Sequence, residues 1–426
     1  MTRLTVLLAT TALFTGVALA QNDNSGLGHV EGVAPATGEA PEAAGQPVET
    51  NPPNAPDQQP ASADQTRAPQ PAEMPQVEAT VVADGLPHLW AMEFLPDGRM
   101  LVTAKEGQMM IVSAEGQAGD PIDGVPEVAS EGQGGLLDVA LSPQFAENQT
   151  IFFSFSEPRD GGNGTSVAKA RLVEDGDTAR LEDVAVIFQQ MPTYDGDKHF
   201  GSRLVFAPDG NLFVTVGERS DPEPRVQSQD LGSGLGKVFR ITPDGEPAEG
   251  NPFIDQEGAL PEIWSYGHRN LQSATLDADG TLWTVEHGPK GGDELNQPQP
   301  SLNYGWPVIT YGVEYSGAKV GEGQTAAEGM EQPVYYWDPV IGPSGMALYT
   351  GDEFPEWQDA LLIGGLVSQG IVVLHTENGR VASEERVPLD ARIRDVRVGP
   401  DGAVYAVTEQ RGGGDSSIIR LTRAAN

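Results

Sequence analysis

Cysteine is absent from this chain of 426 residues, which excludes disulfides, thiolate metal sites and thiol nucleophiles. Basic side chains are also scarce, since 25 lysines and arginines stand against 62 aspartates and glutamates. The resulting net charge of −37 argues against nucleic acid and anionic membrane surfaces as partners. The phosphate-binding loop, the dinucleotide fingerprint, the G-x-S-x-G elbow and the H-E-x-x-H motif are missing too, so a nicotinamide enzyme is not indicated.

Long apolar runs are also missing from the sequence. The stretch Leu4–Val17 follows the basic Arg3 but is short for a membrane span, and Ala18-Leu19-Ala20 has the small residues of a cleavage site. We therefore predict a secretory signal peptide over residues 1–20 and a periplasmic or secreted location. No later run is long enough to cross a bilayer, so no membrane insertion is expected.

Aromatic residues are nearly absent from residues 21–76, which are rich in Pro, Ala, Gln, Gly and acids. Such a composition cannot bury enough apolar surface to offset its ordering entropy, so this segment is predicted to be a disordered linker. Residues 77–426 are expected to form one globular domain.

Helical periodicity is hard to find after residue 77, whereas short β-rich runs separated by turns recur. The six recurring units cover residues 91–112, 136–157, 203–218, 273–288, 346–366 and 395–409. Their spacing of about 45 to 75 residues predicts an all-β fold, a six-bladed β-propeller of four-stranded antiparallel blades. The alternatives fit less well, because two β-sandwiches need a second linker and a solenoid needs a more constant period.

Histidine is scarce, with six in the chain. His199 follows a glycine-rich acidic loop and comes just before the unit at 203–218, where an innermost strand would enter the central channel. It is a candidate catalytic base, and a structural loop histidine is the alternative. His375 lies in the pattern of an outer strand and is expected to be structural.

The run EHGPKGGDELN, residues 286–296, has the composition of a metal-binding loop. Its glycines and proline force an irregular backbone that can turn carbonyl groups toward one point, while Asp293 and Glu294 add carboxylate oxygens. Hard oxygen ligands in a flexible loop suit Ca²⁺ better than zinc. A solvated acidic turn is the alternative.

Arginines in two unusual settings indicate an anionic organic ligand. Arg269 and Asn270 directly follow an apolar strand pattern, and Arg392 and Arg394 are alternate residues of another, so this second pair shares one face. Two guanidinium groups on one face can bind a carboxylate through paired hydrogen bonds. The alternative is that these arginines form surface ion pairs with nearby acidic residues.

Six motifs, in order along residues 79–423, resemble those of the soluble quinoprotein sugar dehydrogenases, the glucose/sorbosone dehydrogenase family, and most closely its aldose sugar dehydrogenase branch. The motifs are GQGGLLDVALSPQF, KHFGSRLVFAPDG, SYGHRNLQ, EHGPKGGDELN, NYGWP and RIRDVRVGPDG. The resemblance implies a six-bladed propeller that holds pyrroloquinoline quinone (PQQ) over a calcium ion. It also implies oxidation of a small sugar and an external electron acceptor.

The resemblance further implies roles for individual residues. His199 is expected to be the general base, and Arg269 is expected to act in catalysis as well as to border the cofactor. The expected cofactor contacts are Gln133, Arg269, Asn270, Gln272, Tyr315, Arg392 and Arg394. The expected calcium ligands are the carbonyl groups of Gly288 and Pro289 at the cofactor, with Glu294 and the Tyr304 carbonyl at a second, structural site.

Two residues depart from the family pattern. Val367 stands where the family commonly has a lysine that contacts the cofactor, and Glu218 stands where some members have Asp beside the catalytic histidine. Val367 favours an alternative in which the propeller only binds carbohydrate or a protein partner. A calcium-dependent lactonase is another alternative, but it leaves Arg392 and Arg394 unexplained.

Overall fold

The computed structural model of the protein describes residues 44–176 and 178–425. The predicted signal peptide, residues 1–20, and the first part of the predicted linker lie outside the described residues. None of the helices in the described part is both long and apolar enough to cross a membrane.

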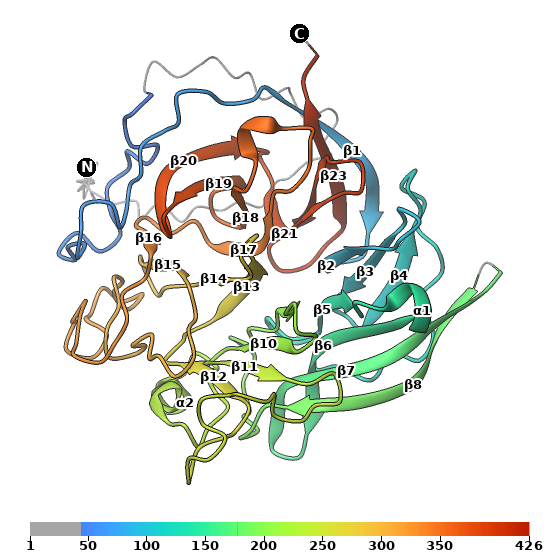
Figure 1. Ribbon diagram of the computed structural model, residues 1–426, viewed down its shortest axis with the longest axis horizontal. Coiled ribbons are helices and arrows are strands. Elements are labelled where there is room, and N and C mark those ends of the chain that lie inside the picture. Colours follow the sequence, from blue (N-terminus) through green and yellow to red (C-terminus); the bar gives the residue numbers. More distant parts are fainter. Residues whose placement is uncertain (1–43, 177, 426) are drawn as a thin grey trace, which may run out of the picture.

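Six antiparallel sheets surround a central axis in chain order, so the predicted six-bladed β-propeller is confirmed (Figure 1). We number the sheets as blades 1 to 6. Blades 1 to 3 contain β2 to β4 (Leu89–Phe94, Met100–Ala104, Gln108–Val112), β5 to β8 (Leu136–Leu141, Thr150–Arg159, Gly162–Asp175, Thr178–Gln189) and β9 to β12 (Leu204–Phe206, Leu212–Val216, Lys237–Ile241, Ile263–Tyr266). Blades 4 to 6 contain β13 to β16 (Leu271–Leu276, Leu282–Glu286, Asp293–Asn296, Tyr335–Trp337), β17 to β20 (Pro343–Leu348, Leu361–Gly365, Gly370–Glu377, Arg380–Pro388) and β21 to β23 (Arg392–Val398, Val404–Glu409, Ser416–Arg423) with β1 (Val77–Leu86).

Helical segments are few and short in the described residues. They are α1 (Phe145–Asn148), α2 (Pro222–Arg225) and the 3-10 helices Val226–Gln229 and Pro355–Trp357. Blade 1 has three strands, and an isolated bridge between Val112 and Ala118 extends its outer side.

The Asp-Gly turns of the repeated units connect the innermost strand of a blade to its second strand. In four blades the glycine amide closes the turn on a carbonyl three residues earlier, at 2.9 to 3.0 Å. These glycines have φ between +77° and +88°, a conformation that costs side-chain-bearing residues energy. They are Gly98, Gly210, Gly280 and Gly402.

The two ends of the propeller are joined in blade 6. Strand β1 from the start of the domain pairs antiparallel with β23 from its end, in a register that sets Val77 opposite Arg423. The first strand thus completes the last blade, and the ring is closed by backbone hydrogen bonds. Interiors between blades are apolar, as in the second strand of blade 3, Leu212–Val216, where all five residues are buried.

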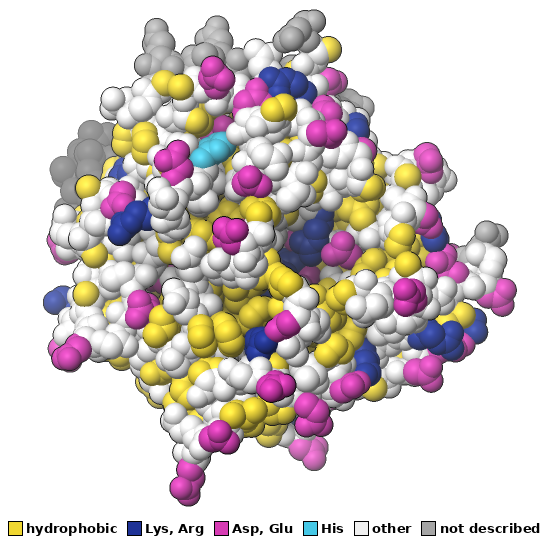
Figure 2. Space-filling model, in the orientation of Figure 1, with side chains coloured by type: hydrophobic (Ala, Val, Ile, Leu, Met, Phe, Trp, Pro, Cys, Tyr) yellow, Lys and Arg dark blue, Asp and Glu magenta, His cyan; other side chains and the backbone are white. Residues whose placement is uncertain are grey.

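Buried charges hold the innermost strands together around the axis. Arg203 donates from Nη1 to Asp138 of blade 2 at 2.7 Å and lies 3.2 Å from Asp395 of blade 6. All three side chains are almost fully buried. Figure 2 shows one face of the ring, which is hollowed near its centre, where basic and acidic side chains lie among hydrophobic ones.

The structure differs from the sequence interpretation at residues 44–76, which were expected to belong to a disordered linker. These residues lie against blades 4 and 5. The amides of Asn54 and Ala55 donate to the Asp338 carboxylate at 2.5 and 3.0 Å, and Ala68 donates to the Tyr335 hydroxyl at 2.8 Å. Backbone amides, with the side chains of Gln65 and Arg67, hold the segment in place, so its polar composition gave no sign of this packing.

Candidate active site

A cavity of about 610 Å³ opens at the mouth where the innermost strands begin. Most of these strands have a register shift near their start, in β2, β5, β13, β17 and β21. Such bulges re-aim side chains at the rims of sheets. The lining includes six residues predicted or noted from sequence: Gln133, Asn270, Gln272, Val367, Arg392 and Arg394.

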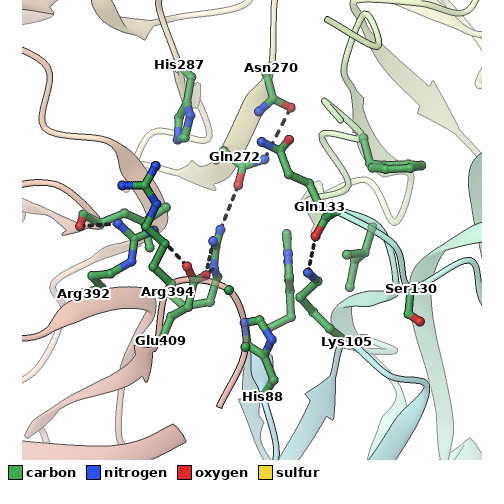
Figure 3. Close-up of a pocket in the computed structure, with 18 of the residues that line it drawn as sticks. His88, Lys105, Ser130, Gln133, Asn270, Gln272, His287, Arg392, Arg394 and Glu409 are labelled. Carbon is green, nitrogen blue, oxygen red and sulfur yellow. Dashed lines mark hydrogen bonds and ion pairs between the residues drawn. The ribbon is translucent and has the colours of Figure 1, made fainter. Parts of the chain in front are cut away.

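Arg392 and Arg394 lie together on one side of the cavity (Figure 3). Both bind the Glu409 carboxylate, Arg392 through Nη2 at 2.9 Å and Arg394 through Nε on the other oxygen. Burial alone would raise the pKa of Glu409, but the two arginines outweigh it and lower that pKa to about 2. The trio therefore carries one net positive charge. Arg394 also donates to Gln272 Oε1 at 3.0 Å.

His199 is buried and forms a dyad with Glu218. Its Nδ1 lies 3.0 Å from Glu218 Oε2, and Trp306 donates its indole N–H to Glu218 Oε1 at 3.1 Å. Burial lowers the pKa of His199, and the nearby Arg269 adds to this, so the imidazole is neutral at neutral pH. Because an ionised Glu218 keeps the proton on Nδ1, the Nε2 lone pair is free, and Nε2 makes no hydrogen bond with the described residues.

The loop that carries His199 is held in a strained backbone conformation. His199 has φ +51° and Ser202 has φ +99°, both in the left-handed half of the map. Gln133 accepts the His199 amide at 2.8 Å, and Asn270 accepts the Gly201 amide at 3.2 Å through its side-chain oxygen. Gln133 and Asn270 thus line the cavity and also position the candidate base.

Arg269 lies behind the cavity wall rather than on its surface. It is 6% exposed, donates from Nη1 to the His287 carbonyl at 2.8 Å, and its guanidinium carbon lies 5.1 Å from the centre of the Trp306 ring. Its Nε is buried with no hydrogen-bond partner among the described residues, as is Nε of Arg392. Two unpaired guanidinium N–H groups beside one cavity fit an absent anion.

The loop 286–296 adjoins the cavity through His287. The Asp293 carboxylate accepts the amides of Gly288, Ile341 and Gly342 at 2.8 to 2.9 Å, so it shapes the loop. The carbonyl oxygens of Gly288 and Pro289 accept no hydrogen bond from the described residues. No group of three or more His, Cys, Asp or Glu side chains within residues 44–176 and 178–425 has metal-binding geometry, so a calcium ion would depend on these carbonyl groups.

Glu294 lies in a second cluster next to Glu286. Asn296 donates from one side-chain nitrogen to Glu286 Oε1 and to Glu294 Oε2, both at 3.1 Å, while its own buried Oδ1 has no partner in the described chain. Burial, and then the charge of Glu286, raises the pKa of Glu294 well above its usual value. An unpaired oxygen beside two carboxylates fits a cation.

Tyr304, the other predicted ligand of the structural site, lies near this cluster. Its ring stacks on His268, which is a hydrogen-bond partner of Glu286.

Two residues singled out from sequence lie elsewhere. The structure does not bring Tyr315 to the cavity, because its side chain is 73% exposed in a surface loop. His375 lies on an outer strand, 3.9 Å from Glu385, as expected for a structural histidine.

Several cavity residues were missed by sequence reasoning. They are His88, Trp90, Lys105, His287 and Glu409. A signal for Glu409 was present in the repeats, because Glu286 and Glu409 end the second strand of their units and Glu218 comes two residues after the end of its own. Each binds a basic residue near the start of the innermost strand of the same blade.

Comparison with known proteins identifies the family. The sequence model of the glucose/sorbosone dehydrogenase family matches residues 86–420. Aldose sugar dehydrogenase YliI of Escherichia coli is 44% identical over 344 residues, which cover 79% of this chain and 91% of that protein. The apo-form crystal structure of the soluble aldose sugar dehydrogenase from Escherichia coli is 42% identical, with a TM-score of 0.78 over 82% of this chain and 100% of its own. The PQQ-bound aldose sugar dehydrogenase from Streptomyces coelicolor is 30% identical, with a TM-score of 0.66 over 82% of this chain and 99% of its own. The chain belongs to the glucose/sorbosone dehydrogenase family, which confirms the resemblance inferred from its motifs.

Proposed function

We propose that this chain is a PQQ- and calcium-dependent dehydrogenase that oxidises the anomeric hydroxyl of an aldose to a lactone. A related sugar aldehyde such as sorbosone, oxidised to the acid, is included in the proposal. The observation that carries it is that a neutral, strained His199 directly precedes Phe200 and Gly201, which line the same cavity as the Arg392–Arg394 pair. A relative with bound PQQ supports the cofactor.

The residues at the mouth fit a flat polyanion. Arg392 and Arg394 would hold carboxylates of PQQ, and the unpaired Nε groups of Arg269 and Arg392 are donors that such an anion would satisfy. Gly288 and Pro289 would give their carbonyl oxygens to calcium. When bound, PQQ supplies an ortho-quinone that accepts hydride, with calcium as the Lewis acid.

His199 would act as the general base on the sugar. Its Nδ1–H is committed to Glu218, so Nε2 would take the proton from the anomeric hydroxyl as the C1–H bond breaks. Gln133 and Asn270 keep the loop of His199 in place for this transfer. Arg269 would stabilise negative charge that develops on the acceptor side of the reaction.

The sequence also bears on the electron acceptor and on the location of the enzyme. An external electron acceptor would complete turnover, because a chain without cysteine has no c-type haem attachment motif. We propose that the enzyme works in the periplasm or outside the cell, on the basis of the predicted signal peptide over residues 1–20.

Reconstitution tests the function directly. PQQ and Ca²⁺ are added to the apoprotein, the absorption spectrum is recorded, and glucose, other aldoses or sorbosone follow with a redox dye. We expect a sugar-dependent change of the spectrum and dye reduction that needs both additions. PQQ binding without turnover on any sugar would instead support a carbohydrate-binding or partner-binding propeller, for which the neutral Val367 is the motivating residue. Lactone cleavage with calcium alone would support a lactonase.

A further inference from the structure

Glu409 neutralises one of the two positive charges of the Arg392–Arg394 pair. Glu409 is ionised and binds both guanidinium groups, so the pair retains a single net charge for a ligand. At the position where the family commonly has a lysine, Val367 lines the same cavity with a neutral side chain that is 56% exposed. A ligand with three carboxylates therefore meets less positive charge on this side than the family pattern supplies.

Lys105 brings a cation to the cavity from another wall. It follows β3 in blade 1, and Figure 3 shows it across the cavity from Arg392 and Arg394. Blades 1 and 5 are the two neighbours of blade 6, so Lys105 and Val367 approach the arginines from opposite sides. Its backbone is fixed on both sides, since its amide donates to the His88 carbonyl at 2.9 Å and its carbonyl accepts the Leu136 amide at 3.1 Å.

The Lys105 ammonium has no bound carboxylate of the kind that Arg392 and Arg394 share in Glu409. At the position that Glu286 and Glu409 occupy in their blades, opposite the start of the innermost strand, blade 1 has Ala104. Lys105 Nζ makes one hydrogen bond within the described residues, to the Gly132 carbonyl at 2.5 Å. The neighbouring carboxylate, Glu106, is more than half exposed and lies 3.6 Å from His88. Burial, and then the charge of Arg394, lowers the pKa of Lys105, and the charges of Glu409 and Glu106 offset this only in part.

We propose that Lys105 binds a carboxylate of the cofactor and replaces the lysine that the family carries at the position of Val367. This inference rests on the proposed function, because it takes PQQ as the ligand. An ammonium with two free N–H donors, half-buried in the cavity wall across from Arg394, suits a carboxylate because the hydrogen bond is charge-assisted.

Calorimetric titration of the apoprotein with PQQ in calcium measures this role without turnover. Lys105→Met should weaken PQQ binding by about tenfold to a hundredfold, the usual effect of one charge-assisted hydrogen bond. Lys105→Arg should stay within about threefold of wild type, because the charge is retained. Lys169→Met is the matched control, since Lys169 lies on the surface of blade 2 beside Asp244 and does not line the cavity.

A second-site variant separates ligand binding from a local structural role. In the Lys105→Met background, Val367→Lys should recover part of the lost PQQ affinity, whereas a structural defect at the Gly132 carbonyl would not be repaired from blade 5. Equal PQQ affinity of Lys105→Met and wild type would overturn the inference, as would a loss that Val367→Lys leaves unchanged. If the wild-type protein binds no PQQ, the proposed function fails, and that result is distinct from both.

Discussion

Two histidine–glutamate dyads occupy equivalent places in neighbouring blades, yet only one leaves its second imidazole nitrogen without a hydrogen bond among the described residues. In blade 3, His199 Nδ1 lies 3.0 Å from Glu218, and in blade 4, His268 Nδ1 lies 2.9 Å from Glu286. In each case the histidine comes a few residues before the innermost strand, and the glutamate comes at the end of the second strand or two residues after it. The blade repeat has thus placed the same pair twice.

The two dyads differ at the second imidazole nitrogen. His268 Nε2 is 2.9 Å from the Ser265 hydroxyl, its ring stacks on Tyr304 at 4.7 Å, and the side chain has no exposed surface. His199 leaves Nε2 free on a strained loop whose next residues line the cavity. The dyad alone therefore does not define a base, because a free lone pair and access to substrate are also needed.

We call the His199–Glu218 pair the open dyad, because its Nε2 is free, and the His268–Glu286 pair the closed dyad. The sharpest test of this difference removes the imidazole of the open dyad. His199→Gln should lower kcat by roughly 10² to 10⁴, the usual contribution of a general base, while PQQ affinity stays near that of wild type. Steady-state kinetics of the reconstituted protein and a PQQ titration give the two numbers. A variant that turns over at the wild-type rate would remove His199 from the mechanism.

Removal of the closed imidazole should affect folding instead of chemistry. His268→Gln loses a buried hydrogen bond to an ionisable group and a ring stack, so the free energy of unfolding should fall by about 2 to 3 kcal/mol. Urea unfolding of the apoprotein measures this loss. With saturating PQQ and calcium, kcat should stay within about threefold of wild type, since His268 Nε2 is occupied by Ser265 and cannot accept a substrate proton. A collapse of kcat with unchanged stability would contradict the division between the dyads.

The contrast also explains what the sequence could and could not predict. The propeller followed from recurring strands and Asp-Gly turns, which are local signals, and His199 followed from its place before an innermost strand. Deciding which of His199 and His268 can act as a base requires the contacts of each imidazole ring. For His268 these contacts come from Ser265 and Tyr304, whose positions no periodic sequence signal predicts. Glu409 was predictable only by aligning the units with one another. Lys105 was not predictable, because its importance depends on the bonds that it lacks.

The pH profile sharpens the comparison without a mutation. Since burial lowers the pKa of His199 below its usual 6.5, the neutral base is fully present at pH 7. We expect kcat to be level above pH 6.5 and to fall about tenfold per pH unit once the pH drops below the lowered pKa. An inflection above pH 7 would mean that another group limits the rate.

The smallest expected effect concerns the neighbour of the closed dyad. Asn296 links Glu286 to Glu294 and leaves its own oxygen unpaired, so the closed dyad adjoins the candidate structural calcium site. A bound ion stabilises only the folded state, by about 1 kcal/mol when calcium is about fivefold above its Kd. Glu294→Ala should therefore lose more thermal stability in calcium than in chelator. Glu328→Ala removes a carboxylate from an exposed loop and should change neither condition. Equal losses for Glu294→Ala in calcium and in chelator would show that the closed dyad supports packing alone, whereas a calcium-dependent loss would show that blade 4 uses its copy of the pair to support a metal ion.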